Sequence, residues 1–385
     1  MTLKPIYSAA LWMLLVCGQA VGQAQPPQEA VAAPPDAEQT PTTAQSGKPD
    51  KPKKRGEFTI APIPVIDPTL GNGMALATLY TVPLDKEDKV SPPSTFGLGG
   101  FRTSTGSWGL AGGGQLFLKQ DRFRILAVGA TAKVSYNFYG IGNASNARSV
   151  AITQSGSGLL VGGLVRVFER WFVGGRYYYF NVSTSLGGKD SEVPAPIQEV
   201  KFKLPVAALG LHIQRDTRPS QFFPRAGSVF DTKLYSSNQS VGALFTYQDY
   251  EVAFQQYFKL GEKQVLAYRV RGCAVNGHAP FFAVCSLGNS ADLRGYPAGR
   301  YRDRRMLVGQ AEFRREIWWR FGLNAFAGMG EVAPTFGDLS ASDIRPGAGI
   351  GARFTVSPKS HINLRVDYGI GRGSHAWYVG IGEAF

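Results

Sequence analysis

The sequence predicts an all-β protein, a transmembrane antiparallel β-barrel, on three observations. Apolar and polar side chains alternate with period two across residues 57–385, as where Phe202 and Leu204 alternate with Lys201 and Lys203. Aromatic residues gather near the ends of the strand-like runs. An export signal precedes these runs, and no later apolar run approaches the ~18 residues that a spanning helix needs. A soluble sandwich would also alternate, but the signal and the aromatic positions favour a lipid-facing outer surface and a polar lumen.

Composition narrows the possible partners. The chain has 385 residues, a formal net charge of +13 and 18% charged residues, against about 25% in typical soluble domains. A positive balance is typical of proteins that bind nucleic acid or a membrane surface. Here the arginines are scattered through alternating strands behind an export signal, so the sequence predicts no nucleic-acid partner. The charges are expected to line a wet interior.

The first residues direct export. Residues 1–24 are typical of a secretory signal peptide, with a basic start, a short apolar stretch and a cleavage site after Ala24 or Ala20. Lipid attachment at Cys17 is an alternative, although Val16 is a poor residue immediately before such a cysteine.

Residues 25–56 predict a disordered linker. They are rich in Pro, Gln, Ala and Thr and then turn basic in KPDKPKKRG, a composition that cannot bury enough apolar surface to fold. The segment is also too short for an independent periplasmic domain, because isolated domains below about 40 residues need disulfides or metals. The barrel is therefore predicted to occupy residues 57–385.

The strand count follows from closure. Fifteen strand-like runs lie between residues 70 and 385. A closed barrel with both termini on the periplasmic side needs an even number, so the sequence predicts 16 strands. Residues 57–66 or the long region 123–167 could hold the missing strand.

A long connection between two of these runs is the main candidate for function. It spans residues 277–304, whereas an ordinary hairpin loop has about two to five residues. A loop of this length inside a compact domain is usually functional or disordered. The stretch ADLRGYPAGRYRDRR, its second half together with Arg305, holds five arginines and two acids, so the loop is expected to fold back onto an acidic surface.

The tip of this loop, Arg294-Gly295-Tyr296, and the following GRYRDRRMLVGQAEFRRE resemble the lumen loop of the BamA/TamA superfamily of outer-membrane barrels, the bacterial surface antigen family. The resemblance implies a sixteen-stranded barrel whose loop drops into the lumen and packs its arginine against the inner wall. It also implies insertion or translocation of proteins, sometimes lipids, through a weak seam between the first and last strands, here 70–82 and 375–385.

A second motif supports the same resemblance. Asp216 and Arg218, in the sequence D-T-R, are followed by Pro224 and Gly227 between two strand-like runs. This pattern is similar to a periplasmic turn of the family, where Pro and Gly make the turn and the charged pair satisfies backbone groups or each other. The expected role is structural.

Arg294 needs an acidic partner, because a buried guanidinium without one is very costly. The acid that the family carries in an F-x-D-x-G pattern is replaced here by Gly328. Glu312, in the strand after the loop, is the first candidate partner, and Glu331, at the end of the next strand, is the second.

Cys273 and Cys285 flank the start of the long loop. They are the only cysteines after the signal peptide, and an even count in an oxidising compartment favours a disulfide. Two free thiols are the alternative.

The last residues resemble the terminal-strand signal that the barrel-assembly machinery recognises. The run from Trp377 to Phe385 alternates apolar and small residues and ends in an aromatic. A plain last strand is compatible with the same pattern.

The sequence points to an outer-membrane protein of a Gram-negative bacterium that is not an enzyme. Its four histidines are far apart, and no catalytic motif, metal site or cofactor site is predicted. The favoured function is insertion or translocation of unfolded outer-membrane or secreted proteins by a monomer in contact with outer-membrane lipid, helped by a separate periplasmic factor. The alternative is a loop-plugged channel or structural barrel.

Overall fold

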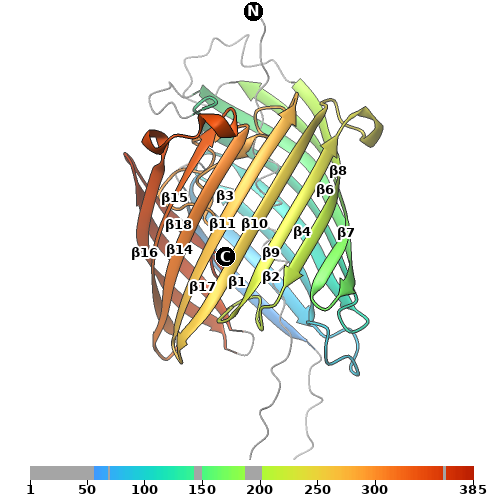
Figure 1. Ribbon diagram of the computed structural model, residues 1–385, viewed down its shortest axis with the longest axis vertical. Coiled ribbons are helices and arrows are strands. Elements are labelled where there is room, and N and C mark those ends of the chain that lie inside the picture. The colour runs from blue at the N-terminus through green and yellow to red at the C-terminus, as the bar shows by residue number, and fades with distance from the viewer. Residues whose placement is uncertain (1–55, 68–69, 143–149, 187–201, 359–360) are drawn as a thin grey trace, which may run out of the picture.

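The chain folds into one sixteen-stranded antiparallel β-barrel (Figure 1). The computed structural model describes residues 56–67, 70–142, 150–186, 202–358 and 361–385. The predicted signal peptide (1–24) and the predicted linker (25–56, apart from its last residue) lie outside the described residues. Among the described residues, no helix is long and apolar enough to cross a membrane.

Each strand pairs with its neighbour in sequence, except where the long loop intervenes between β11 and β14. The strands are β1 (Glu57–Asp67), β2 (Gly71–Val82), β3 (Ser94–Thr103), β4 (Trp108–Leu118), β5 (Phe123–Phe138), β6 (Val150–Phe168), β7 (Trp171–Leu186), β8 (Phe202–Asp216), β9 (Gly227–Ser237), β10 (Tyr247–Gly261), β11 (Gln264–Gly277), β14 (Arg305–Trp318), β15 (Phe321–Ala333), β16 (Arg345–Ser357), β17 (Ile362–Gly371) and β18 (Ser374–Ile381).

The predicted count of sixteen is confirmed, and the strand that the alternation alone left undecided is β1. Its sequence, EFTIAPIPVID, contains Pro62 and Pro64. Proline cannot donate to a ladder, so within sheets it is confined to edge strands or bulges, and its presence lowers the strand signal. β1 is an edge strand of this sheet, which runs in order from β1 to β18.

The period-two alternation separates the two faces of the wall. In β1, Phe58 and Ile60 are 61% and 57% exposed and face outward, while Ala61 is 5% exposed and faces the lumen. A one-residue slip would exchange the two faces, so the lipid-facing and lumen-facing residues together specify the register.

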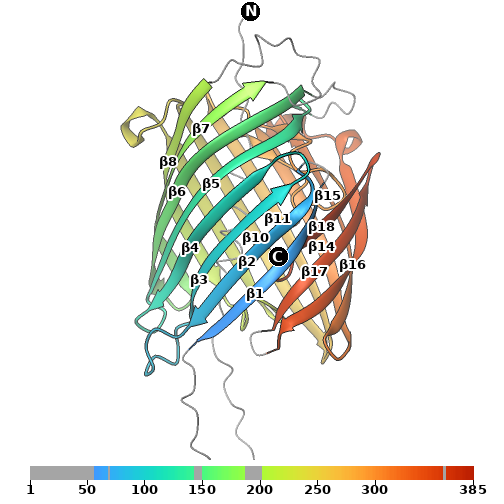
Figure 2. The same ribbon diagram turned by 180° about the vertical axis from the view of Figure 1, so that it is seen from behind.

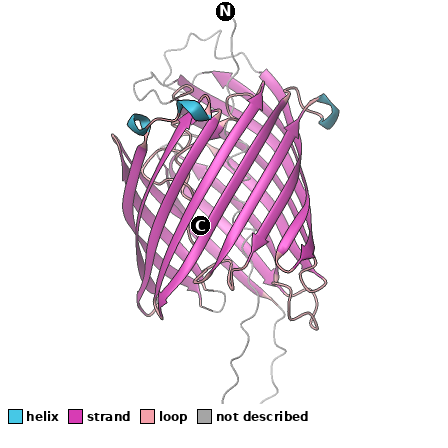
Figure 3. Ribbon diagram, viewed as in Figure 1, coloured by secondary structure: helices cyan, strands magenta, loops and turns pink. Residues whose placement is uncertain are grey.

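The long loop enters the barrel, as predicted. It carries a two-stranded ribbon of its own, β12 (Cys285–Ser286) with β13 (Arg302–Asp303). The short helical turns η1 (Gln239–Val241), η2 (Phe336–Asp338) and η3 (Ala341–Asp343) lie on the same rim from which the loop descends (Figure 3).

The seam of the barrel differs from the predicted one. Its first strand is β1, not the run 70–82, because the two prolines of β1 weaken the strand signal in the sequence. In Figure 2, β1 lies beside the last strands of the barrel. Between β1 and β18 the described residues form no strand ladder.

The last strand is shorter than the predicted run 375–385, because β18 ends at Ile381. Trp377 lies in β18 and is 44% exposed on the outer surface, but Phe385 is only 6% exposed and lies inside the barrel. Gly382, with a φ of +79°, turns the chain away from the strand direction. Phe385 then packs with Val229, Tyr257 and Ala267 of β9, β10 and β11.

We expect a spin label on Trp377→Cys to be relaxed by oxygen dissolved in the bilayer, because this position faces lipid. A label on Phe385→Cys should be shielded from oxygen, because this position lies in the packed lumen. Power-saturation electron paramagnetic resonance of the two labelled proteins in vesicles measures both. Equal oxygen accessibility at the two positions would contradict the inward turn of the chain.

Candidate functional site

The loop tip places a charged side chain deep inside the barrel. Arg294 is 0% exposed, and its neighbours Leu293 and Tyr296 are also 0% exposed. A local turn presents the tip, because the Asn289 side-chain oxygen accepts hydrogen bonds from the backbone N–H groups of Ala291 (2.9 Å) and Asp292 (3.0 Å). Side-chain capping of this kind lets a short segment fold without a strand partner.

Arg294 is held by two carboxylates and an aromatic ring. Its guanidinium pairs with Glu312 on β14 and with Asp367 on β17, the latter through Nη1 at 2.7 Å from Oδ2. The centre of the guanidinium lies 3.5 Å from the Phe326 ring centroid. A desolvated cation over an aromatic face gains roughly 2 kcal/mol. The buried charge is therefore fully compensated by neighbours from three strands.

The structure brings Glu312 to Arg294, as the strand pattern indicated, and places Glu331 elsewhere. Glu331 is an odd number of positions from the inward-facing Phe326, so it points to the opposite face of β15. Its Oε1 accepts a hydrogen bond from the Ser340 backbone N–H at 2.9 Å, under the loop that follows β15. The second candidate partner was therefore wrong, because side chains in a strand alternate between the two faces.

Asp367 was missed by the sequence analysis. It lies on β17, two strands beyond β15, and its level on the wall could not be known without the register. The residue paired with it on β16 is Gly351, where any side chain would collide with the Asp367 carboxylate. The glycine therefore leaves the space through which this carboxylate reaches the lumen.

The ion pairs continue from the loop to the end of the chain. Arg314 Nε lies 2.8 Å from Glu312, and Arg353 Nη1 lies 2.6 Å from Asp367. Arg353 Nε reaches Glu383 at 2.8 Å, and Arg314 Nη2 donates to the backbone oxygen of Phe385 at 2.8 Å. We call this set, Arg294, Glu312, Arg314, Arg353, Arg365, Asp367 and Glu383, the lumen network.

The tip also contacts the last strand directly. The Gly295 N–H donates to the Tyr378 hydroxyl at 2.9 Å, and that hydroxyl donates to the Tyr296 backbone oxygen at 2.8 Å. Gly295 has a φ of +116°, and a Cβ there would lie 2.6 Å from the Ile370 backbone oxygen. Both the conformation and the close approach require glycine. Tyr378 therefore joins the loop to β18.

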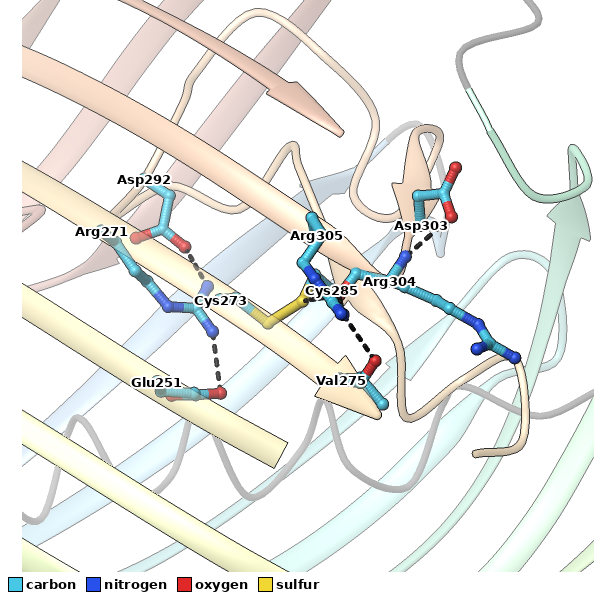
Figure 4. Close-up of a disulfide and its surroundings, with 9 residues drawn as sticks. All are labelled: Glu251, Arg271, Cys273, Val275, Cys285, Asp292, Asp303, Arg304 and Arg305. Carbon is cyan, nitrogen blue, oxygen red and sulfur yellow. Dashed lines mark hydrogen bonds and ion pairs between the residues drawn. A yellow bond between two sulfur atoms is a disulfide. The ribbon is translucent and has the colours of Figure 1, made fainter. Parts of the chain in front are cut away.

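A second ionic contact lies behind the tip. Asp292 accepts a hydrogen bond from Arg269 at 3.0 Å. It also accepts from Arg271 at 2.7 Å, and Arg271 reaches Glu251 at 2.8 Å (Figure 4). Burial would raise the pKa of the Asp292 carboxyl, but Arg271 and Arg269 lower it to about 2. The loop thus keeps a negative charge against the wall of β11 at neutral pH.

Cys273 and Cys285 form a disulfide that joins β11 to the first part of the loop (Figure 4). Their side chains are 4% and 3% exposed, within an apolar cluster that includes Tyr296 and Met306. A cross-link over 12 residues contributes roughly 3 kcal/mol in the chain-entropy account.

The periplasmic-turn motif closes the β8–β9 connection. Asp216 pairs with Arg218 at 2.8 Å, and its carboxylate also accepts the Arg218 backbone N–H at 3.1 Å. Gly227 has a φ of +88°, and a Cβ there would lie 2.5 Å from the Thr217 oxygen. Pro224 lies in the same connection, whose Phe222 enters the lumen and is 1% exposed. These contacts support a structural role for the motif.

The described residues contain no group of three or more His, Cys, Asp or Glu side chains that could hold a metal ion. The loop, its buried arginine and the inward end of the chain are instead held by ion pairs and hydrogen bonds. A barrel of sixteen antiparallel strands with an apolar outer surface has the architecture of a bacterial outer-membrane protein.

Comparison with known families identifies the kind of barrel. Residues 113–385, more than half of the chain, match the Omp85 superfamily domain. The chain belongs to the Omp85 superfamily. No individually curated protein matches it.

Solved structures share the fold at low sequence identity. BamA from Haemophilus ducreyi lacking POTRA domains 1–3 is 15% identical with a TM-score of 0.54, over 86% of this chain and 69% of that one. CdiB from Escherichia coli is 9% identical with a TM-score of 0.58, over 86% and 62%. CdiB from Acinetobacter baumannii is 10% identical with a TM-score of 0.54, over 84% and 58%. This chain therefore spans less than two thirds of either CdiB chain.

We predict that Arg294→Ala destabilises the loop and the barrel, because Glu312 and Asp367 each lose one of their buried cations and the loop loses its ionic contact with the wall. Removing one partner of a buried ion pair costs about 3–5 kcal/mol. Urea titration of the protein folded in lipid vesicles measures the free energy of unfolding, and limited proteolysis reports the loop.

Arg304→Ala is the matched control, because Arg304 lies in the same loop and is exposed. It should change stability by less than about 0.5 kcal/mol. Glu312→Gln should weaken protease resistance of the loop and Glu331→Gln should leave it unchanged. The reverse order of these two variants would contradict the position of Arg294.

The disulfide makes a separate prediction. Alkylation of the unreduced, denatured protein should add no mass at Cys273 or Cys285, and alkylation after reduction should add two labels. The double variant Cys273→Ser/Cys285→Ser should lose roughly 3 kcal/mol while the barrel still folds. Two labels without reductant would show that both thiols are free.

Proposed function

We propose that this barrel inserts or translocates unfolded outer-membrane or secreted proteins at the outer membrane. The observation that carries the proposal is the direct connection between the loop tip and the last strand. Tyr378 on β18 exchanges hydrogen bonds with Gly295 and Tyr296 at 2.9 and 2.8 Å. The loop therefore braces the strand that borders the seam.

The seam supports this function because its two strands are open to new pairing. An edge strand presents unpaired backbone N–H and C=O groups, and an extended client segment can add to them as a further strand. β1 carries two prolines and β18 has only 8 residues, so neither strand is built for a long ladder with the other. We propose a monomer that receives its clients from a separate periplasmic factor.

The second candidate function is a loop-plugged channel. It is favoured by the lumen network, which fills the space between the loop and the strands β14 to β17. Bilayer conductance of a variant lacking residues 277–304 tests it. A large steady pore in the deletion variant alone favours the plugged channel.

The decisive experiment compares outer-membrane proteomes, by mass spectrometry, between a strain lacking this protein and its parent. We expect a defined set of barrels or surface proteins to disappear from the deletion strain. Arg304→Ala should restore this set and Arg294→Ala should not, when both variants reach the membrane in equal amounts. An unchanged proteome under several growth conditions would contradict the proposal.

A further inference from the structure

The inner wall of the barrel has two chemically different halves. Most of its charged side chains lie on β9 to β17, where the loop and the lumen network lie, and the exceptions on β5 to β8 include Arg124, Arg176 and His212. The inward positions of β1 to β8 form a continuous apolar belt at one level, made of Ala61, Ala77, Gly99, Ala111, Ala130, Gly158, Phe180 and Val206. The predicted polar lumen is therefore interrupted at this level by an apolar belt on β1 to β8.

The apolar half is not a continuation of the wet interior. In β1 to β5, the inward side chains between Thr59 and Val65, and those of the neighbouring strands at the same levels, include no charged group among the described residues. Glu57 and Arg124 lie only at the periplasmic ends of their strands. On β5 to β8 the apolar surface is covered by Phe281 and Phe282 of the long loop, whereas on β1 to β4 it borders an unfilled space.

A cavity of about 80 Å³ lies against this half, beside the seam. Both edge strands line it: Thr59 and Ala61 come from β1, and Ile381 comes from β18. Phe222 of the β8–β9 connection and Ile362 of β17 also line it. We call this space the seam cavity.

The seam cavity and the lipid phase meet at the same gap. On the outer surface of β1, Phe58 and Ile60 are 61% and 57% exposed, so bilayer hydrocarbon reaches the edge of this strand. On the other side of the gap, β18 ends at Ile381 and Gly382 turns the chain inward. No strand ladder between β1 and β18, in the part of the chain that the structure describes, closes the way from one side to the other.

The chemistry of the walls selects the occupant. A buried water needs two to four polar partners. The polar side chains that line the seam cavity are Thr59 and Thr78, and the Thr78 hydroxyl already donates to the Leu98 backbone oxygen, so the mainly apolar wall favours an apolar occupant. A hydrocarbon chain that fills the cavity is stabilised by contact with its apolar walls. The volume suits the end of one chain and is far too small for a client strand.

We propose that the seam cavity binds the end of a hydrocarbon chain of an outer-membrane lipid, which enters sideways between β1 and β18. Alanine and glycine line the cavity so that a chain fits where larger side chains would fill the space. The lipid packs against the wall that the lumen network does not reach. This inference does not depend on the transport of proteins.

The test uses the whole protein in nanodiscs of dimyristoyl-phosphatidylcholine, with alanine methyl groups labelled and all other protein protons replaced by deuterium. Nuclear Overhauser effects between these methyls and lipid chain protons report contact. Ala77 and Ala111 line the cavity. We expect both to show cross-peaks to lipid chain protons and none to water.

Two further alanines calibrate the result. Ala127 on β5 is exposed on the outer surface and should show lipid cross-peaks in any case. Ala253 on β10 is 7% exposed and lies on the charged half, so it should show no lipid cross-peak. Cross-peaks from Ala77 and Ala111 to water, with none to lipid, would overturn the proposal.

A variant with a filled cavity distinguishes a lipid chain bound in the cavity from lipid that only lies near it. Leu79→Trp adds bulk to the cavity wall from β2 and should abolish the lipid cross-peak of Ala111 while that of Ala127 persists. If this variant does not fold, Thr59→Val/Ala61→Leu fills the cavity from β1 with a smaller change. Persistence of the Ala111 cross-peak in a folded, filled variant would also overturn the proposal.

Discussion

A single buried guanidinium sets the arrangement of this barrel. Arg294 is 0% exposed, and a charge in that position is stable only if carboxylates meet it with good geometry. Glu312 and Asp367 supply them from strands that lie on the two sides of β15 and β16. The loop can therefore occupy the lumen in one position, and the strands that carry the acids must hold one register.

The same constraint reaches the end of the chain. Arg314 and Arg353 share the carboxylates that hold Arg294, and each of them also binds the tail through Glu383 or Phe385. Because the tail is drawn into the lumen, β18 ends at Ile381. The short last strand and the seam are thus consequences of an ionic arrangement that begins at the loop. The disulfide and Asp292 restrict the loop further, on the side of β11.

Individual residues show which predictions the alternation of apolar and polar side chains can support. Glu312 was within reach of prediction because it shares a face of its strand with Gln310 and Arg314. Glu331 was misplaced because its position along the chain was considered without the face of the strand on which its side chain lies. Asp367 had a visible signal, an acid between inward residues near the end of the chain, but its distance from Arg294 depends on pairing across β15 and β16. Phe385 was misplaced because alternation cannot show where a strand stops.

The sequence by itself determined the all-β class, the even strand number, the entry of the arginine-rich loop into the lumen and the family. These follow from period-two patterning, closure and local motifs, which need no knowledge of contacts between distant residues. Tertiary structure alone decided the second carboxylate of Arg294, the inward turn at Gly382, and the apolar belt on the inner face of β1 to β8. Each of these depends on which residues share a level around the barrel, and that level is set by the register of every ladder between them.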